Sequence, residues 1–104
     1  MDQKDKDIAK TVKSAVREFD PSAKVVLFGS RARGDAHKDS DYDFLVLLNL
    51  PLDFQLKTRI LDKLYDIELA FDCVLGVLVE NSTHWQMQEN TPIFSEISQD
   101  GITV

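Results

Sequence analysis

The spacing of apolar residues in the first third of the chain predicts one helix and one strand. Apolar side chains recur every three or four residues from Ile8 to Phe19, which predicts an amphipathic helix over residues 4–18. The Asp20-Pro21 pair ends this helix, because the residue before a proline disfavours the helical conformation. The segment "AKVVLF" then predicts a strand that stops at Gly29-Ser30. We expect "SRARG" to form a brief helical turn and "DAHKDS" to form a polar loop.

The rest of the chain continues the alternation of strands and helices. The run "DYDFLVLLNL" predicts a second strand closed by Pro51, residues 54–71 predict a helix, and "DCVLGVLV" predicts a third strand. Two short helices follow, the first capped by Asn81 or Ser82 and the second begun by Thr91-Pro92 and ended by Gly101. This order predicts an α/β (α+β) fold, with a small mixed sheet of about three to four strands packed on helices.

Length and composition indicate one ordinary globular domain over residues 1–104. The chain is 43% hydrophobic and 29% charged, and 104 residues suffice for a single core. No apolar run reaches the length of a signal peptide or a membrane span, so we expect a cytoplasmic protein. The single cysteine, Cys73, has no partner for an internal disulfide and no companions for a zinc site, and we interpret it as a small core residue.

Charge is unevenly distributed along the chain. The net charge is −6, and after Lys63 there is no Lys or Arg while seven acidic residues follow. Two interpretations stay open for this acidic part, namely solubility and an electrostatic docking face for a basic protein. Both disfavour direct nucleic-acid binding, because a phosphate backbone would meet net repulsion.

Two carboxylates interrupt the predicted second strand at alternate positions. Asp41 and Asp43 share one face of the strand, while Tyr42 and Phe44 turn into the packing on the other face. Two carboxylates so close together repel each other unless a cation compensates. Mg²⁺ is the natural cation, since it prefers one or two carboxylates and takes its remaining oxygens from water and phosphate.

The turn before these aspartates has the composition of a phosphate-binding loop. Gly29 allows close approach of the backbone, and Ser30 adds a hydroxyl and an N–H at the start of a helical turn. The sequence is neither GxxxxGK[ST] nor GxGxxG, so it is not one of the two common nucleotide loops. Arg31, Arg33 and Lys38 are the nearest bases and could neutralise a triphosphate.

The combination Gly-Ser, ten residues, Asp-x-Asp resembles the signature of minimal nucleotidyltransferases of the DNA polymerase β superfamily. The length and the tail "PIFSEISQDGITV" are also similar to the MNT-domain antitoxins of the MntA type, which are encoded beside HEPN-domain ribonuclease toxins. The resemblance implies a nucleotidyltransferase core in which Gly29 and Ser30 hold the triphosphate of ATP and Asp41 and Asp43 bind two Mg²⁺ ions.

Members of this superfamily often add a third carboxylate from a neighbouring strand. Asp72, at the expected start of the third strand, is the first candidate for this catalytic and metal-binding role. Glu68, on the preceding helix, is the second candidate. The alternative for Asp72 is a solvent-exposed residue at a helix end.

Three functions are compatible with these features. The first is transfer of AMP from ATP to a hydroxyl. The resemblance implies a HEPN toxin as the partner and a tyrosine as the acceptor, which would make the chain its antitoxin. The second is a non-catalytic module that neutralises the toxin by docking, and the third is a transferase acting on a small molecule. We expect His37 and His84 to be surface residues and Trp85 to pack a short helix.

Overall fold

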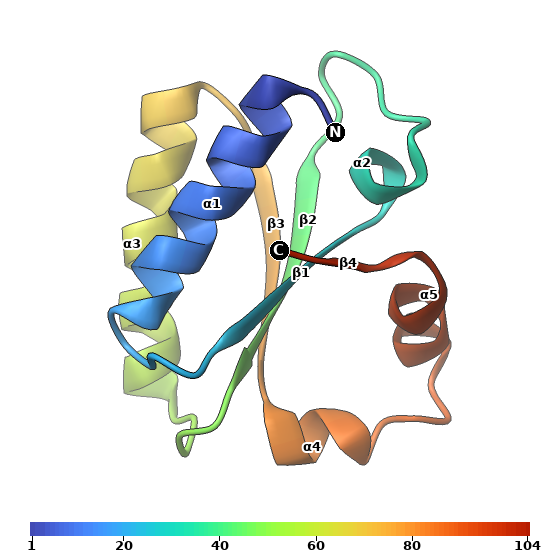
Figure 1. Ribbon diagram of the computed structural model, residues 1–104. Coiled ribbons are helices and arrows are strands. Elements are labelled where there is room, and N and C mark those ends of the chain that lie inside the picture. Colours follow the sequence, from blue (N-terminus) through green and yellow to red (C-terminus); the bar gives the residue numbers. More distant parts are fainter.

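The computed structural model describes residues 1–104 and contains one sheet surrounded by helices (Figure 1). The elements follow one another as α1 (Gln3–Arg17), β1 (Lys24–Phe28), α2 (Ser30–Arg33), β2 (Tyr42–Leu48), α3 (Phe54–Phe71), β3 (Leu75–Asn81), α4 (Ser82–Gln86), α5 (Pro92–Asp100) and β4 (Ile102–Thr103). This order confirms the predicted α/β class.

The sheet is mixed, with the strand order β3-β2-β1-β4. Strand β1 runs antiparallel to both β2 and β4, whereas β2 and β3 are parallel. The parallel pair needs a crossover, and helix α3 provides it. Strand β2 is therefore central, and the predicted Asp-x-Asp pair lies at its N-terminal end, with Asp41 just before the strand and Asp43 inside it.

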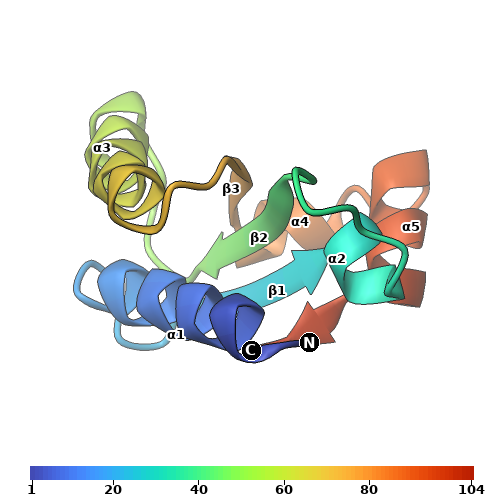
Figure 2. The same ribbon diagram turned by 90° about the horizontal axis from the view of Figure 1, so that it is seen from above.

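Helices cover the two faces of the sheet unequally. Helices α1 and α3 pack side by side on one face, and the shorter α4 and α5 lie on the other (Figures 1 and 2). The larger core lies under α1 and α3, and its largest fully buried side chains are Ile8, Val12, Val16, Val25, Leu27, Phe44, Val46, Leu48, Ile60 and Val79. A second, smaller cluster joins Trp85 and Ile97 to the opposite face of the sheet.

Side-chain caps begin several of the helices. Asp2 caps α1 by accepting the Asp5 N–H, and Asn81 caps α4 by accepting two N–H groups. Thr91 accepts the Phe94 N–H at the start of α5, and Gly101 follows its last residue. Each cap pairs N–H groups that have no partner within the helix. The predicted starts of α4 and α5 are therefore confirmed, whereas the Asp2 cap of α1 was not predicted.

Strands β2 and β3 have other bounds than predicted, and β4 was not predicted. Strand β2 covers Tyr42–Leu48 and not residues 41–50, so Asp41 lies just before it. Strand β3 begins at Leu75 and not at Asp72, because Asp72 adopts a left-handed conformation (φ 50°) that ends α3. The two-residue strand β4 was not predicted, since so short a segment carries no periodic pattern. None of the helices is both long and apolar enough to cross a membrane.

Candidate active site

The carboxylate of Asp43 lies where three segments of backbone meet. In the sheet, Asp43 is opposite Phe28 of β1 on one side and Gly76 of β3 on the other. A Cβ added to Gly76 would stand 2.6 Å from Asp43 Oδ1, and a Cβ added to Gly29 would collide with Asp43 Oδ2. Both glycines therefore make room for this carboxylate.

Gly29 has a second reason to be glycine. It connects β1 to α2 with a φ of 73°, a conformation that residues with a side chain rarely adopt. The N–H groups of Ala32 and Arg33 bond to its carbonyl oxygen, so the turn leads directly into α2. The Gly29-Ser30 turn thus holds the start of α2 against the Asp43 carboxylate, as a phosphate-binding loop beside a metal site requires.

The two aspartates have different environments. Asp41 is exposed just before β2, whereas Asp43 is half-buried. The pKa of Asp43 is raised above that of an ordinary aspartate, first by burial and then by the negative charges of Asp41 and Glu96, while Arg33 acts in the opposite direction. Since Tyr42 is buried on the other side of the strand, the alternation predicted from the sequence is observed.

This environment suits a divalent cation. The carboxylates of Asp41 and Asp43 are the oxygen ligands that Mg²⁺ prefers, and one or two of them suffice. A cation bound here would also relieve the repulsion that raises the Asp43 pKa. The residues present therefore fit the metal that the sequence pattern implies.

Arg33 connects the Gly29-Ser30 turn to helix α5. Its guanidinium lies 3.3 Å from the Asp35 carboxylate, 3.9 Å from Glu96 and 3.7 Å from Asp100. No local pattern indicated that α5 would reach the site, because Glu96 and Asp100 lie more than fifty residues from the Asp-x-Asp pair. Gly76 was also missed, although a glycine inside a strand can indicate a close approach by another group.

Arg31 has a structural environment that differs from the expected role in nucleotide binding. Its guanidinium donates to the carbonyl oxygens of Lys38 (3.2 Å) and Ser40 (2.9 Å). It also lies 3.7 Å from the Asp5 carboxylate and 4.2 Å from the centre of the Tyr42 ring. With 11% of its side chain exposed, Arg31 holds the loop before β2 and is not free to reach a ligand on the Asp43 side.

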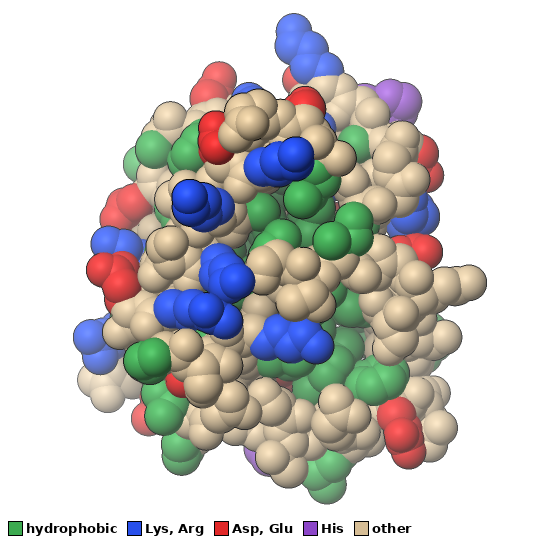
Figure 3. All heavy atoms as spheres, viewed as in Figure 1, with side chains coloured by type: hydrophobic (Ala, Val, Ile, Leu, Met, Phe, Trp, Pro, Cys, Tyr) green, Lys and Arg blue, Asp and Glu red, His purple; other side chains and the backbone are tan.

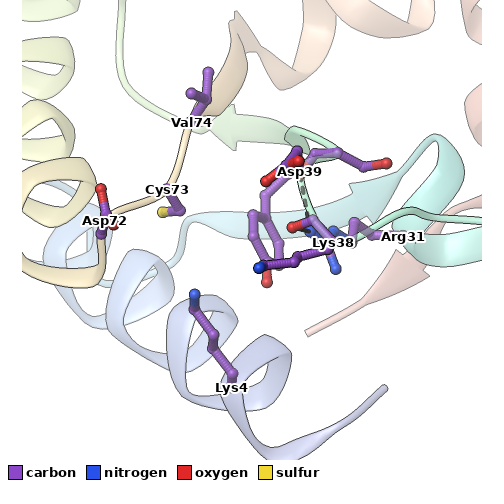
Figure 4. Close-up of a pocket in the computed structure, with 9 residues that line it drawn as sticks. Lys4, Arg31, Lys38, Asp39, Asp72, Cys73 and Val74 are labelled. Carbon is purple, nitrogen blue, oxygen red and sulfur yellow. Dashed lines mark hydrogen bonds between the residues drawn. The ribbon is translucent and has the colours of Figure 1, made fainter.

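Asp72 lies at the same end of the sheet but in a different pocket. This pocket has a volume of about 260 Å³, and Figure 4 shows Asp72 and Cys73 on one side of it, with Arg31 and Lys38 on the other. The buried Tyr42 also lines it, so the pocket lies on the side of β2 opposite to Asp43. No three carboxylate, His or Cys side chains lie close enough together to hold a metal ion.

The structure therefore brings Asp41 and Asp43 together with Gly29, Ser30 and Arg33, but it does not gather Asp72 into one ligand set with them. The other candidate, Glu68, accepts the Leu75 N–H at 3.1 Å and so stabilises the connection between α3 and β3. The "DCVLGVLV" run looked like one strand because a left-handed aspartate that ends a helix has no sequence signal of its own.

The single cysteine, the two histidines and the tryptophan lie in the surroundings that the sequence predicts. Cys73 is half-buried against the larger core, and burial raises the pKa of its thiol. His37 and His84 are exposed. Trp85 is buried and stacks on Phe94, with 5.1 Å between the ring centres.

Comparison with known proteins places this arrangement in a family. The sequence model of the nucleotidyltransferase domain matches residues 9–96. MJ0604 of Methanocaldococcus jannaschii, named as a candidate protein adenylyltransferase, is 27% identical over 75% of this chain and 73% of its own length. MntA of Haemophilus influenzae, named as a probable protein adenylyltransferase, is 33% identical over 68% of this chain, which spans only 61% of the Haemophilus protein.

Solved structures share the fold. A toxin-antitoxin complex with AMP-PNP contains a chain with a TM-score of 0.61 and 21% identity, over 91% of this chain and 70% of that one. A complex of the tri-AMPylated Shewanella oneidensis HEPN toxin with its MNT antitoxin gives a TM-score of 0.60 and 18% identity, over 95% and 70% of the two chains. Because the family match covers most of the sequence and includes the whole Gly-Ser and Asp-x-Asp arrangement, the chain belongs to the nucleotidyltransferase domain family.

Proposed function

We propose that this nucleotidyltransferase transfers AMP from ATP to a hydroxyl group of a partner protein, with a tyrosine of a HEPN-type RNase toxin as the acceptor. The observation that carries the proposal is the Asp43 carboxylate, held between Gly29 and Gly76 beside Asp41. The relatives named as protein adenylyltransferases support a protein acceptor. The structural neighbours described as toxin-antitoxin complexes support the class of partner.

Each residue of the site has a proposed task. Asp41 and Asp43 hold Mg²⁺, which when bound would polarise the α-phosphate and stabilise the pyrophosphate leaving group. The Gly29-Ser30 turn contacts the triphosphate through N–H groups at the start of α2. Arg33 neutralises part of the triphosphate charge, and it exchanges its exposed ion pairs with Glu96 and Asp100 for this contact.

The reaction requires one bond to form and one to break at the α-phosphorus of ATP. The acceptor oxygen bonds to this phosphorus, the bond to the bridging oxygen of pyrophosphate breaks, and the acceptor proton leaves to a base. Asp72 stays the predicted base. It is exposed at the same end of the sheet, but it lines the pocket on the side of β2 opposite to Asp43, so it can take the proton only from an acceptor hydroxyl that lies at the end of this strand. An aspartate here would act mainly in the transition state.

The acceptor has to come from a partner. We propose that residues 1–104 act as one minimal nucleotidyltransferase domain. The pocket beside Asp72 has a volume of only about 260 Å³, and the larger pocket, of about 460 Å³, lies between α1 and α3, away from Asp43. The acidic segment after Lys63 suits docking to the basic surface that an RNA-cleaving toxin needs for its substrate. AMP attached near that surface would place a phosphate where RNA binds. The toxin would then stay inactive after the complex separates.

The second candidate function is neutralisation by docking alone. It predicts loss of toxin activity without a covalent change, and the Gly29, Asp41 and Asp43 arrangement would then be unused. A transferase for small molecules is the third candidate, and it would leave the toxin unmodified and active.

Mass spectrometry of the toxin separates these candidates. The product of the neighbouring gene is incubated with ATP, Mg²⁺ and either the wild-type chain or Asp43→Asn, and its mass and RNase activity are measured. We expect a mass increase by one or more AMP groups and loss of RNase activity with the wild-type chain only. An unchanged mass with lost RNase activity for both chains would favour docking.

A further inference from the structure

Helix α1 carries a row of basic residues that the proposed function does not use. Lys6, Lys10, Lys13 and Arg17 are separated by four, three and four residues. At 3.6 residues per turn and 1.5 Å per residue, they fall within about 60° of the helix circumference and extend over about 16 Å. We call these four residues the basic track.

The basic track is exposed and lacks internal ion pairs. Lys6, Lys10 and Arg17 are exposed and Lys13 is partly exposed, and none of the four forms a salt bridge within the chain. Arg17 uses its Nε to donate to the Ala23 carbonyl oxygen (3.1 Å), which leaves its terminal nitrogens free for another contact. Positive charge held so close together without compensation is unfavourable until an anion binds.

The fold places this positive charge on one face of α1, apart from most acidic residues that follow Lys63, although Asp66 of α3 lines a pocket with Thr11 and Ser14 of α1. Figure 3 shows Lys and Arg side chains gathered over α1 and the start of β1, with Asp and Glu at the margins of that face. The exposed Lys24, the first residue of β1, adds a fifth base there. The net charge of −6 belongs to the whole chain, so it predicts neither the local charge of this face nor the kind of partner that binds there.

A regular polyanion matches the basic track better than a compact anion does. Four bases in a line over about 16 Å cannot converge on one phosphate, but they can follow a chain of repeated negative charges. Helix α1 contains no aromatic residue, so nothing on the track can stack on bases. It also presents no large apolar residue that could enter a lipid surface.

We propose that the basic track binds the phosphate backbone of a polynucleotide, independently of base sequence and of the candidate active site. With four phosphate contacts on a single strand, the logarithm of the affinity should fall with the logarithm of the salt concentration with a slope of about −3. Raising the salt from 50 to 200 mM then weakens binding roughly 50-fold. The affinity itself should be low, with a Kd on the order of 10–100 µM at the lower salt concentration.

Fluorescence anisotropy of a labelled, unstructured 20-nucleotide RNA tests the proposal, with no ATP or Mg²⁺ present. The double variant Lys10→Gln, Lys13→Gln removes two of the four charges and should halve the salt slope. The control Lys57→Gln, Arg59→Gln removes two exposed charges from α3 that also form no salt bridge, and it should keep the wild-type slope. A DNA strand of the same length should give a similar slope, because only the backbone is contacted.

The proposal is overturned if the wild-type chain shows no salt-dependent binding, or if the α1 and α3 variants lose affinity equally. It is also overturned if poly-glutamate binds more tightly than RNA, since the basic track would then be a docking face for an acidic protein. Amide chemical shifts in an RNA titration give an independent readout, and we expect the largest changes within residues 6–17 and at Lys24. Changes confined to residues 28–43 would assign the binding to the candidate active site and refute the proposal.

Discussion

The substitution Gly76→Ala tests whether the position of the Asp43 carboxylate carries the activity. An alanine Cβ at this position would lie 2.6 Å from Asp43 Oδ1, while ordinary contact begins at 3.4 Å. The carboxylate must therefore move by about 0.8 Å. Reacting groups have to be held to within about 0.5 Å, and a misplacement of about 1 Å can reduce a rate by roughly 100-fold.

The same substitution should leave the fold intact. Gly76 does not have a positive φ, so alanine fits the strand backbone, and the displaced atom is the end of a flexible side chain. Replacing glycine by alanine in a strand stabilises the fold by roughly 0.5–1 kcal/mol, because alanine loses less backbone entropy on folding. This gain offsets part of the cost of the new contact. We expect the free energy of unfolding to change by less than about 1 kcal/mol while AMP transfer falls by about 30- to 100-fold.

Urea unfolding and the rate of AMP transfer to the toxin, measured on the same preparations, provide the assay. The double variant Gly76→Ala, Asp43→Asn serves as the control, because a glycine that acts only through the carboxylate should add nothing once that carboxylate is gone. If Gly76→Ala transfers AMP at a rate within threefold of the wild-type rate, the position of the Asp43 carboxylate does not control the activity and the reasoning is refuted.

Four further predictions follow from the site and its surroundings. Asp43→Asn should reduce AMP transfer by 100-fold or more. At pH 7 it should be as stable as the wild type or slightly more stable, because the raised pKa of Asp43 means that its ionisation opposes folding; thermal melts should show this difference shrinking as the pH falls through the raised pKa and disappearing well below the ordinary value of 3.8, where the carboxylate is protonated in both states. Tyr42→Phe should lower the free energy of unfolding by about 1–3 kcal/mol in urea, because it removes a 2.6 Å hydrogen bond to a buried carboxylate of α1. Asp20→Ala should lower it by about 2 kcal/mol at pH 7, because hydrogen bonds from the β2 end and the α1–β1 turn depress the pKa of Asp20; its contribution is present above about pH 4, and the difference between the two chains should shrink as the pH falls below 4 through the depressed value. Asp72→Asn should lower kcat by about tenfold with little change in the KM for ATP, and an unchanged kcat would exclude Asp72 as the base.

Short-range patterns determined most of the fold. The helix over residues 54–71 matches the structure in full, because its apolar spacing and the Asp53 cap act within the helix itself. Thr91-Pro92 and Gly101 bound α5 for the same reason. The Gly-Ser and Asp-x-Asp pattern also identified the family, since a strand fixes which side chains share a face whatever it packs against.

The tertiary structure alone decided which distant groups meet. Gly76 lies opposite Asp43 only because β3 pairs in parallel with β2 in one register, and Glu96 reaches Arg33 only because α5 folds back beside α2. Arg31 and Arg33 are indistinguishable in the sequence, yet one is buried against Tyr42 and the other faces the site. The separation of the basic track from most of the acidic residues after Lys63 likewise depends on the packing of whole helices, and neither net charge nor local spacing contains that information.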